Sequence, residues 1–147
     1  KPDSRGTIMA ASADPFARPA IKPNYLTTRT DELALLGGTR HVRKIFAAPA
    51  LAQHSKGEIQ PGPDIKSDAD LLAYARRAGN TLYHPVGTCK MGEDPRAVVD
   101  SRLRVRGVQG LRVIDASVMP TLTTGNTNAP TIMIGEKGAE MIAADAR

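Results

Sequence analysis

Two stretches of this sequence concentrate side chains that could transfer a proton or hold a polar ligand. The first is residues 83–92, with the sequence YHPVGTCKMG, in which His84 directly precedes a proline. An imidazole titrates close to neutral pH, so it is well suited to accept or release a proton there. A histidine that merely closes a loop is the more common case, and the residues alone leave both roles open.

The second stretch is residues 115–131, which contains DASVMP and ends in TGNTNAPT. Asn128 comes just before Ala129 and Pro130, where a helical pattern begins. Taken by itself, Asn128 is best interpreted as a helix N-cap, since a short polar side chain can bond the free N–H groups of a first turn. Exposed N–H groups at such a helix start also make a site for a developing negative charge.

The remaining reactive side chains fit structural roles better. Nothing in the sequence pairs Cys89 with a base, so we predict that this thiol is structural. A single cysteine excludes an internal disulfide, and no Cys and His cluster has the spacing of zinc ligands, so no metal site is predicted. His41 and His54 lie among basic and small residues, which indicates surface positions.

The elements that must position these residues follow from local patterns. The stretch Gly6–Ala10 reads as a strand, and the regularly spaced prolines after it exclude a regular helix and predict extended chain and turns; they are Pro15, Pro19 and Pro23. A helix is expected from Thr30, with acidic residues in its first turn and an interruption at Gly37-Gly38.

Further along, a loop at residues 60–64 separates that helix from a second one. Ser67 and Gly79 mark the expected ends of the second helix, as N-cap and C-cap. The alternation of residues 98–117 predicts strands with a bend at Gln109-Gly110. A third helix is expected from Pro130, so both chemical stretches fall in loops between regular elements, where binding groups concentrate.

Length and composition limit the class of protein. A chain of 147 residues, 41% hydrophobic and 24% charged, is one ordinary domain and small for an enzyme with separate nucleotide and substrate regions. The net charge is +5, and the densest basic runs are 40–44 and 102–106, which we interpret as solvated faces rather than a nucleic-acid-binding surface. No apolar run reaches transmembrane length. We expect a cytoplasmic protein, with peripheral membrane association left open, and the start at Lys1 without Met suggests the middle of a longer protein.

Three motifs in order resemble one enzyme family. They are HPVGTCKMG at 84–92, VIDASVMP at 113–120 and GNTNAPT at 125–131. Together they resemble the C-terminal motif set of the glucose–methanol–choline (GMC) oxidoreductases, closest to the choline-dehydrogenase-like branch. Shorter matches at 4–6, 14–15 and 24–26 extend the likeness over nearly the whole chain. The dinucleotide fingerprint G-x-G-x-x-G, which opens such proteins, has no counterpart in this sequence.

The resemblance implies an FAD-dependent enzyme that oxidises the CH–OH group of an alcohol by hydride transfer to flavin N5. His84 matches the catalytic histidine that accepts the hydroxyl proton. Asn128 matches the second catalytic position, where it would hold the substrate oxygen. The positions that match flavin contacts are Asp115 and Ala116, toward the ribityl and pyrophosphate, and Ala129, Pro130 and Thr131, whose backbone would face the pyrimidine edge.

The resemblance also implies an α+β fold in two parts. Residues 1–78 are expected to form an antiparallel-sheet substrate-binding cap region with packed helices. Residues 79–147 are expected to carry the catalytic loop, a flavin-contacting strand and a C-terminal helix that complete an FAD-binding domain. The expected partners are a small alcohol and the N-terminal FAD-binding half of the same protein. The alternative is a catalytically silent folding or assembly module that is active only with that half; the alcohol, the electron acceptor and the oligomeric state stay open.

Overall fold

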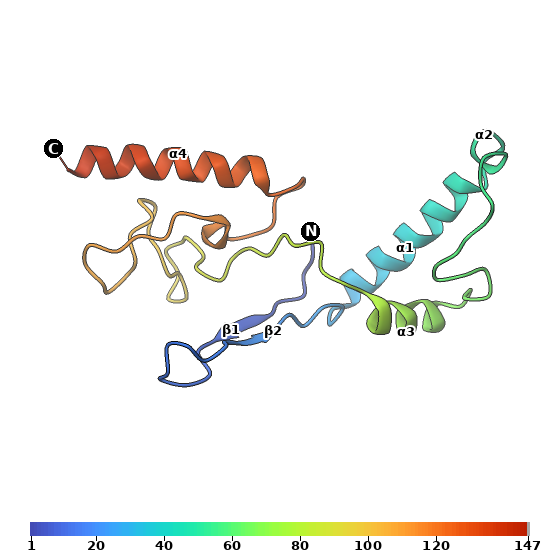
Figure 1. Cartoon of the computed structure of the whole chain (residues 1–147), viewed down its shortest axis with the longest axis horizontal. Coiled ribbons are helices and arrows are strands. Elements are labelled where there is room, and N and C mark those ends of the chain that lie inside the picture. The colour runs from blue at the N-terminus through green and yellow to red at the C-terminus, as the bar shows by residue number, and fades with distance from the viewer. Residues whose placement is uncertain (147) are drawn as a thin grey trace. The chain divides into compact units, whose positions relative to one another are not determined.

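A computed structural model describes residues 1–146 of the chain. The fold is α+β, with a small antiparallel sheet and helices (Figure 1). The chain divides between Asn80 and Thr81 into two compact units, each described here by itself. We call residues 2–80 the N-terminal unit and residues 81–146 the C-terminal unit. The boundary lies near the one expected at residue 78, while the functions assigned to the two parts stay predictions.

The N-terminal unit opens with a β-hairpin. Strand β1 (Thr7–Met9) pairs antiparallel with β2 (Ala20–Lys22), so that Thr7 lies opposite Lys22. Gly6 permits this pairing, because a Cβ at that position would lie 2.4 Å from the carbonyl oxygen of Lys22. The strand and the helix-free, proline-containing segment are therefore as predicted.

Helix α1 (Arg29–Phe46) is capped by Thr28, whose hydroxyl accepts from the N–H of Asp31. The helix continues through Gly37 and Gly38, so the expected interruption is wrong. Two glycines cost about 2 kcal/mol of helix stability. Tertiary packing of the same helix offsets that cost, because Leu36 is only 1% exposed in a core with two leucines of α3.

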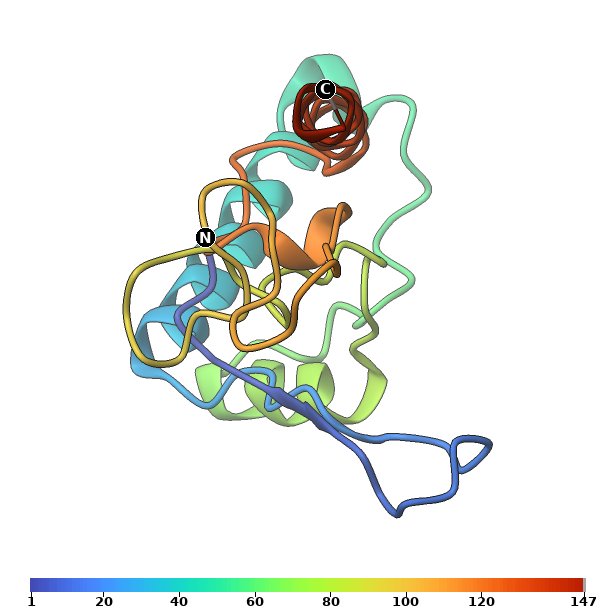
Figure 2. The same cartoon turned by 90° about the vertical axis from the view of Figure 1, so that its left-hand side faces the viewer.

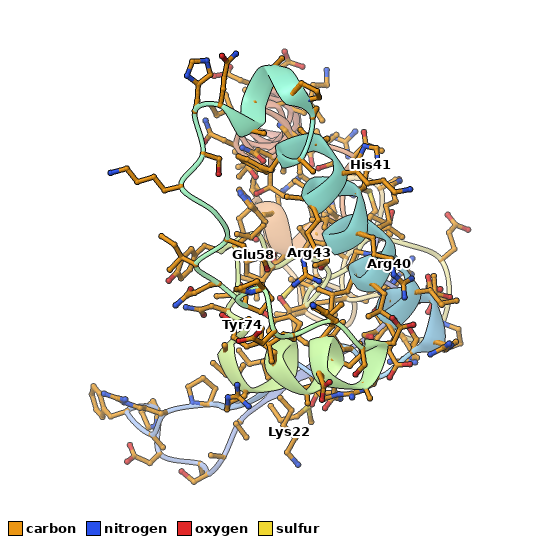
Figure 3. The ribbon with its side chains drawn as sticks, turned by 90° about the vertical axis from the view of Figure 1, so that its right-hand side faces the viewer. Lys22, Arg40, His41, Arg43, Glu58 and Tyr74 are labelled. Atoms are coloured by element: carbon orange, nitrogen blue, oxygen red, sulfur yellow. The ribbon has the colours of Figure 1, made fainter. Side chains whose placement is uncertain are left out.

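Helix α3 (Asp68–Ala78) has the predicted ends. The Ser67 hydroxyl accepts from the N–H of Asp70 at 3.1 Å, and Gly79 is the C-cap. A short helix, α2 (Pro49–Ala52), lies between α1 and α3 and was not predicted. Figure 3 shows Arg43 of α1 directed at Glu58 in the loop that follows α2, and two hydrogen bonds of 2.9 and 2.8 Å join their side chains. This ion pair fastens the loop to α1.

The C-terminal unit contains a short 3-10 helix, η1 (Ala116–Val118), and one long helix, α4 (Asn128–Asp145). Figure 2 views α4 almost along its axis, and η1 packs against it. Irregular chain and η1 supply most of the core; its buried members are Val99, Leu103, Val118, Met119 and Ile134. None of the described helices combines the length and apolar character needed to cross a bilayer.

The strands predicted for residues 98–117 are not formed. This segment makes only isolated bridges, from Met91 to Val99, from Val99 to Val105 and from Arg104 to Arg112. The reason is backbone conformation, because Leu103, Gly107 and Gly110 have φ values of +63°, +78° and +72°. Left-handed residues every three or four positions stop an extended run from propagating. The bend expected at Gln109-Gly110 is present.

Candidate active site

His84 contacts the second chemical stretch directly. Its Nδ1 lies 2.6 Å from the hydroxyl oxygen of Thr127, 43 residues later in the chain. The imidazole is half-buried and Thr127 is only 7% exposed, so the contact is partly shielded from water. The two stretches that concentrate polar side chains in the sequence therefore meet at His84 and Thr127.

Backbone hydrogen bonds hold the His84 loop in place. The N–H of Cys89 donates to the Ser117 carbonyl at 3.0 Å, and the N–H of Met91 donates to the Val118 carbonyl at 2.8 Å. Val118 is fully buried in the core, so this pairing ties the loop to a rigid region. Cys89 is a free, half-buried thiol in the middle of the pairing, a position that supports the structural role predicted for it.

A tight turn brings the loop close to the chain after η1. Gly87 has a φ of +85°, which side-chain-bearing residues rarely adopt. A Cβ on Gly87 would lie 3.3 Å from the carbonyl oxygen of Met119. Glycine therefore permits both the turn and the close backbone approach that lead away from His84.

Asn128 is the first residue of α4 and is exposed. The N-cap position belongs to Thr127, so the interpretation of Asn128 as the cap is wrong by one residue. The helix begins one residue early because the Thr127 backbone is already in the helical region, with φ −82° and ψ −6°, and its carbonyl accepts from the N–H of Thr131. Within residues 1–146 no hydrogen bond engages the Asn128 amide, which is consequently available to a ligand.

The first turn of α4 also presents free donors. Thr127 makes no side-chain cap bond, although Thr is a common N-cap residue. Thr131 N–H donates to the Thr127 carbonyl at 3.0 Å and Pro130 has no N–H, whereas the N–H groups of Asn128 and Ala129 have no acceptor among the described residues. The positive end of the helix dipole lies at the same place. This turn can stabilise negative charge.

Asp115 and Ala116 are placed by η1 rather than by the strand end expected for them. The exposed Asp115 caps η1, because its Oδ1 accepts from the N–H of Ser117 at 2.7 Å. Its second oxygen, Oδ2, has no hydrogen-bond partner in the described part of the chain. Ala116 is half-buried and packs against the core. No hydrogen bond within residues 1–146 joins either residue to His84 or Thr127.

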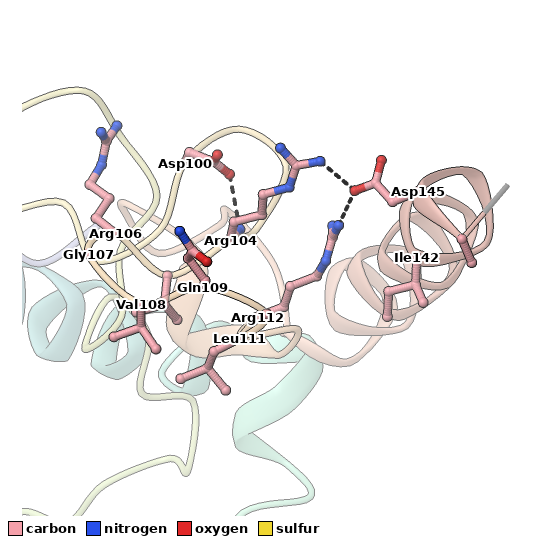
Figure 4. A pocket seen from close by; sticks show the side chains of 13 residues that line it. Asp100, Arg104, Arg106, Gly107, Val108, Gln109, Leu111, Arg112, Ile142 and Asp145 are labelled. Carbon is pink, nitrogen blue, oxygen red and sulfur yellow. Dashed lines mark hydrogen bonds and ion pairs between the residues drawn. The ribbon is translucent and has the colours of Figure 1, made fainter.

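A groove of the C-terminal unit lies away from His84, beside the last turns of α4 (Figure 4). Since α4 has 18 residues, its two ends are about 27 Å apart. At the C-terminal end, Asp145 accepts hydrogen bonds from Arg102 at 2.6 Å, from Arg104 at 2.5 Å and from Arg112. Hydrogen bonds from Arg104 and then Arg112 lower the pKa of Asp145 to about 2.

This arginine–aspartate cluster consists of Arg102, Arg104, Arg112 and Asp145, and the sequence did not indicate it. Its contacts join residues 33 to 43 positions apart, which no local pattern reports. Arg106, the third basic residue of the run, donates to the Gly92 carbonyl at 2.6 Å. The guanidinium groups expected to be solvated are thus bonded within the protein, although the side chains of Arg102 and Arg104 stay 41% and 48% exposed.

Comparison with known proteins identifies the family. The family model described as GMC oxidoreductase matches residues 2–135. Alcohol dehydrogenase [acceptor] of Pseudomonas putida is 52% identical over 96% of this chain and 26% of its own length. The mitochondrial choline dehydrogenase of Homo sapiens is 49% identical over 95% of this chain and 24% of its own length.

Among solved structures, an FAD-dependent oxidoreductase from Chaetomium thermophilum is 30% identical, with a TM-score of 0.86 over 97% of this chain and 25% of its own. The chain spans about a quarter of the length of the curated relatives it matches. The resemblance seen in the three motifs is confirmed, and the chain belongs to the GMC oxidoreductase family.

Proposed function

We propose that this chain carries the proton-transfer and substrate-oxygen groups of an FAD-dependent oxidoreductase that oxidises the CH–OH group of an alcohol. The observation that carries the proposal is the 2.6 Å contact between His84 and Thr127. It holds an imidazole next to Asn128, whose amide is exposed, at the uncapped start of α4. The names of the curated relatives, an alcohol dehydrogenase and a choline dehydrogenase, support the substrate class.

The chemistry assigned to the two side chains follows from the acidity of alcohols. An alcohol hydroxyl is a very weak acid, so hydride leaves its carbon readily only as the oxygen loses its proton. His84 accepts that proton as a general base. Asn128 donates a hydrogen bond from its amide to the same oxygen, which stabilises the negative charge that develops there. When bound, FAD supplies the acceptor for the hydride.

The donors at the start of α4 fit this cofactor. The reduced isoalloxazine carries negative charge at its pyrimidine edge, and the N–H groups of Asn128 and Ala129, with the helix dipole, provide matching positive potential. Pro130 and Thr131 complete the same turn. On the other segment, the free Oδ2 of Asp115 is an acceptor suited to a ribityl hydroxyl, and Ala116 offers backbone next to it. These residues are the proposed cofactor contacts.

The proposal includes an N-terminal FAD-binding region as the partner of this chain. The chain has no G-x-G-x-x-G fingerprint, and its relatives are about four times longer. Large apolar side chains on α4 are exposed within this chain and would be covered by such a region; they are Ile132, Met133 and Ile142. The same exposed side chains favour the second candidate function, a folding or assembly module that is silent until the N-terminal region is present.

The experiment compares the 147-residue chain with a complete protein that contains it. The complete protein is expected to purify with FAD and to lose its flavin absorbance when a primary alcohol, such as choline, is added without oxygen. The chain alone should bind FAD weakly or not at all. A complete protein without flavin, or with flavin that no alcohol reduces, would contradict the proposed function. Tight stoichiometric FAD on the chain alone would contradict the need for the N-terminal region.

A further inference from the structure

The Thr127 hydroxyl has an unusual hydrogen-bond partner for a helix-capping threonine. In α1 and α3 the hydroxyls of Thr28 and Ser67 accept hydrogen bonds from the helix backbone, as cap residues normally do. The hydroxyl of Thr127, at the start of α4, makes no such bond and lies instead 2.6 Å from Nδ1 of His84. The hydroxyl of this cap residue therefore hydrogen-bonds to the imidazole rather than to the helix backbone.

The contact bears on which nitrogen of His84 carries hydrogen. A neutral imidazole has one N–H and one lone pair, and its partners select between the two tautomers. Two groups of Thr127 face Nδ1: the hydroxyl oxygen at 2.6 Å and the backbone nitrogen at 3.5 Å. The backbone N–H can only donate, so it favours a lone pair on Nδ1 and a hydrogen on Nε2. A hydroxyl can donate or accept.

We propose that Thr127 is the positioning residue of His84, and that its hydroxyl accepts the Nδ1 hydrogen and leaves the lone pair on Nε2. At 2.6 Å the hydroxyl can donate or accept, and the backbone N–H at 3.5 Å is too far away to fix the tautomer. The proposed role of His84 decides between the two, because Nε2 can accept the substrate proton only if it carries the lone pair. This inference rests on the proposed function, in which His84 accepts a proton.

The assigned tautomer allows the proton to move without any rearrangement of the ring. The substrate O–H bond breaks, its proton goes to Nε2, and Nδ1 keeps its hydrogen. The resulting imidazolium is a donor at both nitrogens, so Nδ1 continues to donate to Thr127. The opposite tautomer carries its hydrogen on Nε2 and cannot take the proton there.

The test uses two substitutions in the complete enzyme. Thr127→Val keeps the side-chain shape but removes the hydroxyl, so the backbone N–H becomes the sole partner of Nδ1 and the inactive tautomer is favoured. Loss of a hydrogen bond to a charged group corresponds to about a 10- to 100-fold slower reduction of flavin by alcohol. Thr127→Ser keeps the hydroxyl and is expected to reduce flavin at nearly the parental rate.

A second readout does not depend on turnover. Diethyl pyrocarbonate acylates an imidazole nitrogen that carries a lone pair, and peptide mass spectrometry follows each histidine separately. In the 147-residue chain and in the complete enzyme, His84 should be acylated more slowly in Thr127→Val than in the parent or Thr127→Ser. His41 and His54 are exposed and lie in the N-terminal unit, so they serve as internal references whose rates should not change.

The outcomes separate this inference from the proposed function. If His84→Ala leaves flavin reduction intact, the proposed role of His84 fails. If His84→Ala reduces flavin slowly while Thr127→Val keeps the parental rates of flavin reduction and of His84 acylation, the positioning role is overturned and the proposed function stands. A Thr127→Ser variant as slow as Thr127→Val would also overturn it. Thr127→Val added to His84→Ala should cause no further loss, and Thr127→Ala provides a second hydroxyl-free variant if valine impairs folding.

Discussion

The two ends of α4 satisfy their polar groups in opposite ways. At the first turn the cap hydroxyl of Thr127 contacts His84, the Asn128 amide is exposed, and two N–H groups have no acceptor in residues 1–146. At the last turn the Asp145 carboxylate accepts from the three guanidinium groups of the arginine–aspartate cluster, of which Figure 4 shows those of Arg104 and Arg112. The first end is open to a ligand and the second is closed within the chain.

The uncapped first turn lowers the stability of α4, and the carboxylate at the last turn needs positive charge beside it. A missing Thr cap typically forgoes about 0.5–2 kcal/mol, which a protein tolerates where unpaired donors serve a ligand. A carboxylate at a helix C-terminus faces the negative end of the dipole and is unfavourable by itself. The arginines reverse this, because their positive charges neutralise Asp145 and suit the dipole. Substitutions at the first end should therefore change catalysis, and those at the second end should change stability.

The largest expected effect is at His84. In the complete enzyme, His84→Ala should slow flavin reduction by alcohol about 10²- to 10⁴-fold while alcohol binding changes little, because general-base catalysis is worth that factor. Anaerobic stopped-flow against pH is the measurement: the parental rate should rise through one ionisation and then level, and the variant should lack that rise. His41→Ala is the matched control. A fast His84→Ala variant with the parental pH curve would remove this residue from the mechanism.

Asn128→Ala is expected to lower turnover by about 10²- to 10³-fold, as for other single donors to a developing oxyanion. Flavin content should stay close to the parental value, since only the side-chain amide is lost and the backbone N–H remains. The checks are steady-state turnover and the flavin-to-protein absorbance ratio. Parental turnover would reduce Asn128 to an ordinary first residue of a helix.

Between the two ends, α4 packs so closely that one glycine is required. A Cβ on the buried Gly138 would lie 2.4 Å from Cγ2 of Ile114, whereas a Cβ on Gly135 would meet nothing within 4 Å. Gly138→Ala should lower the free energy of unfolding by about 1–3 kcal/mol through overpacking. Gly135→Ala should leave it unchanged or raise it by up to about 1 kcal/mol. Urea denaturation of both variants is the measurement, and equal effects would show that Ile114 yields freely.

The smallest expected effect is at the closed end. Asp145→Asn should lower stability at neutral pH, because it removes the charge that three arginines share, while flavin reduction stays near the parental rate. The folded-state pKa of about 2 lies below the usual 3.8, so the ionised carboxylate stabilises the fold above about pH 4. That contribution is lost as the pH falls from about 4 to about 2.

Denaturant titrations at pH 7 and pH 3 measure this effect. Asp145→Asn should lose less stability than the parent between these pH values, and added salt should narrow the difference at pH 7. Glu140→Gln is the matched control, since it breaks an exposed ion pair with Lys137 in the same helix and should change little. An Asp145→Asn variant that kept its stability but reduced flavin more slowly would contradict the assignment of catalysis to the first end of α4 and stability to the second.

Local interactions are what the sequence by itself determined. Ser67 caps α3 through Asp70, as predicted, and α1 begins close to the predicted Thr30, although its cap is Thr28, which bonds Asp31 three positions on. Such contacts form within one turn, so their residue types and spacing predict them. The three motifs likewise indicated the family and pointed to His84 and Asn128 before their surroundings were known. The alternation of residues 98–117 wrongly predicted strands, because it does not report the left-handed residues that interrupt them.

Long-range contacts are what only the tertiary structure decided. Thr127 in sequence is one more threonine before a helix, and local chemistry predicts that it caps that helix. Its hydroxyl instead contacts His84, 43 positions earlier in the chain, because backbone hydrogen bonds hold the loop of residues 84–92 against η1. The same holds for Asp145 and its arginines. A contact of this kind depends on packing that brings distant segments together, and no spacing along the chain records it.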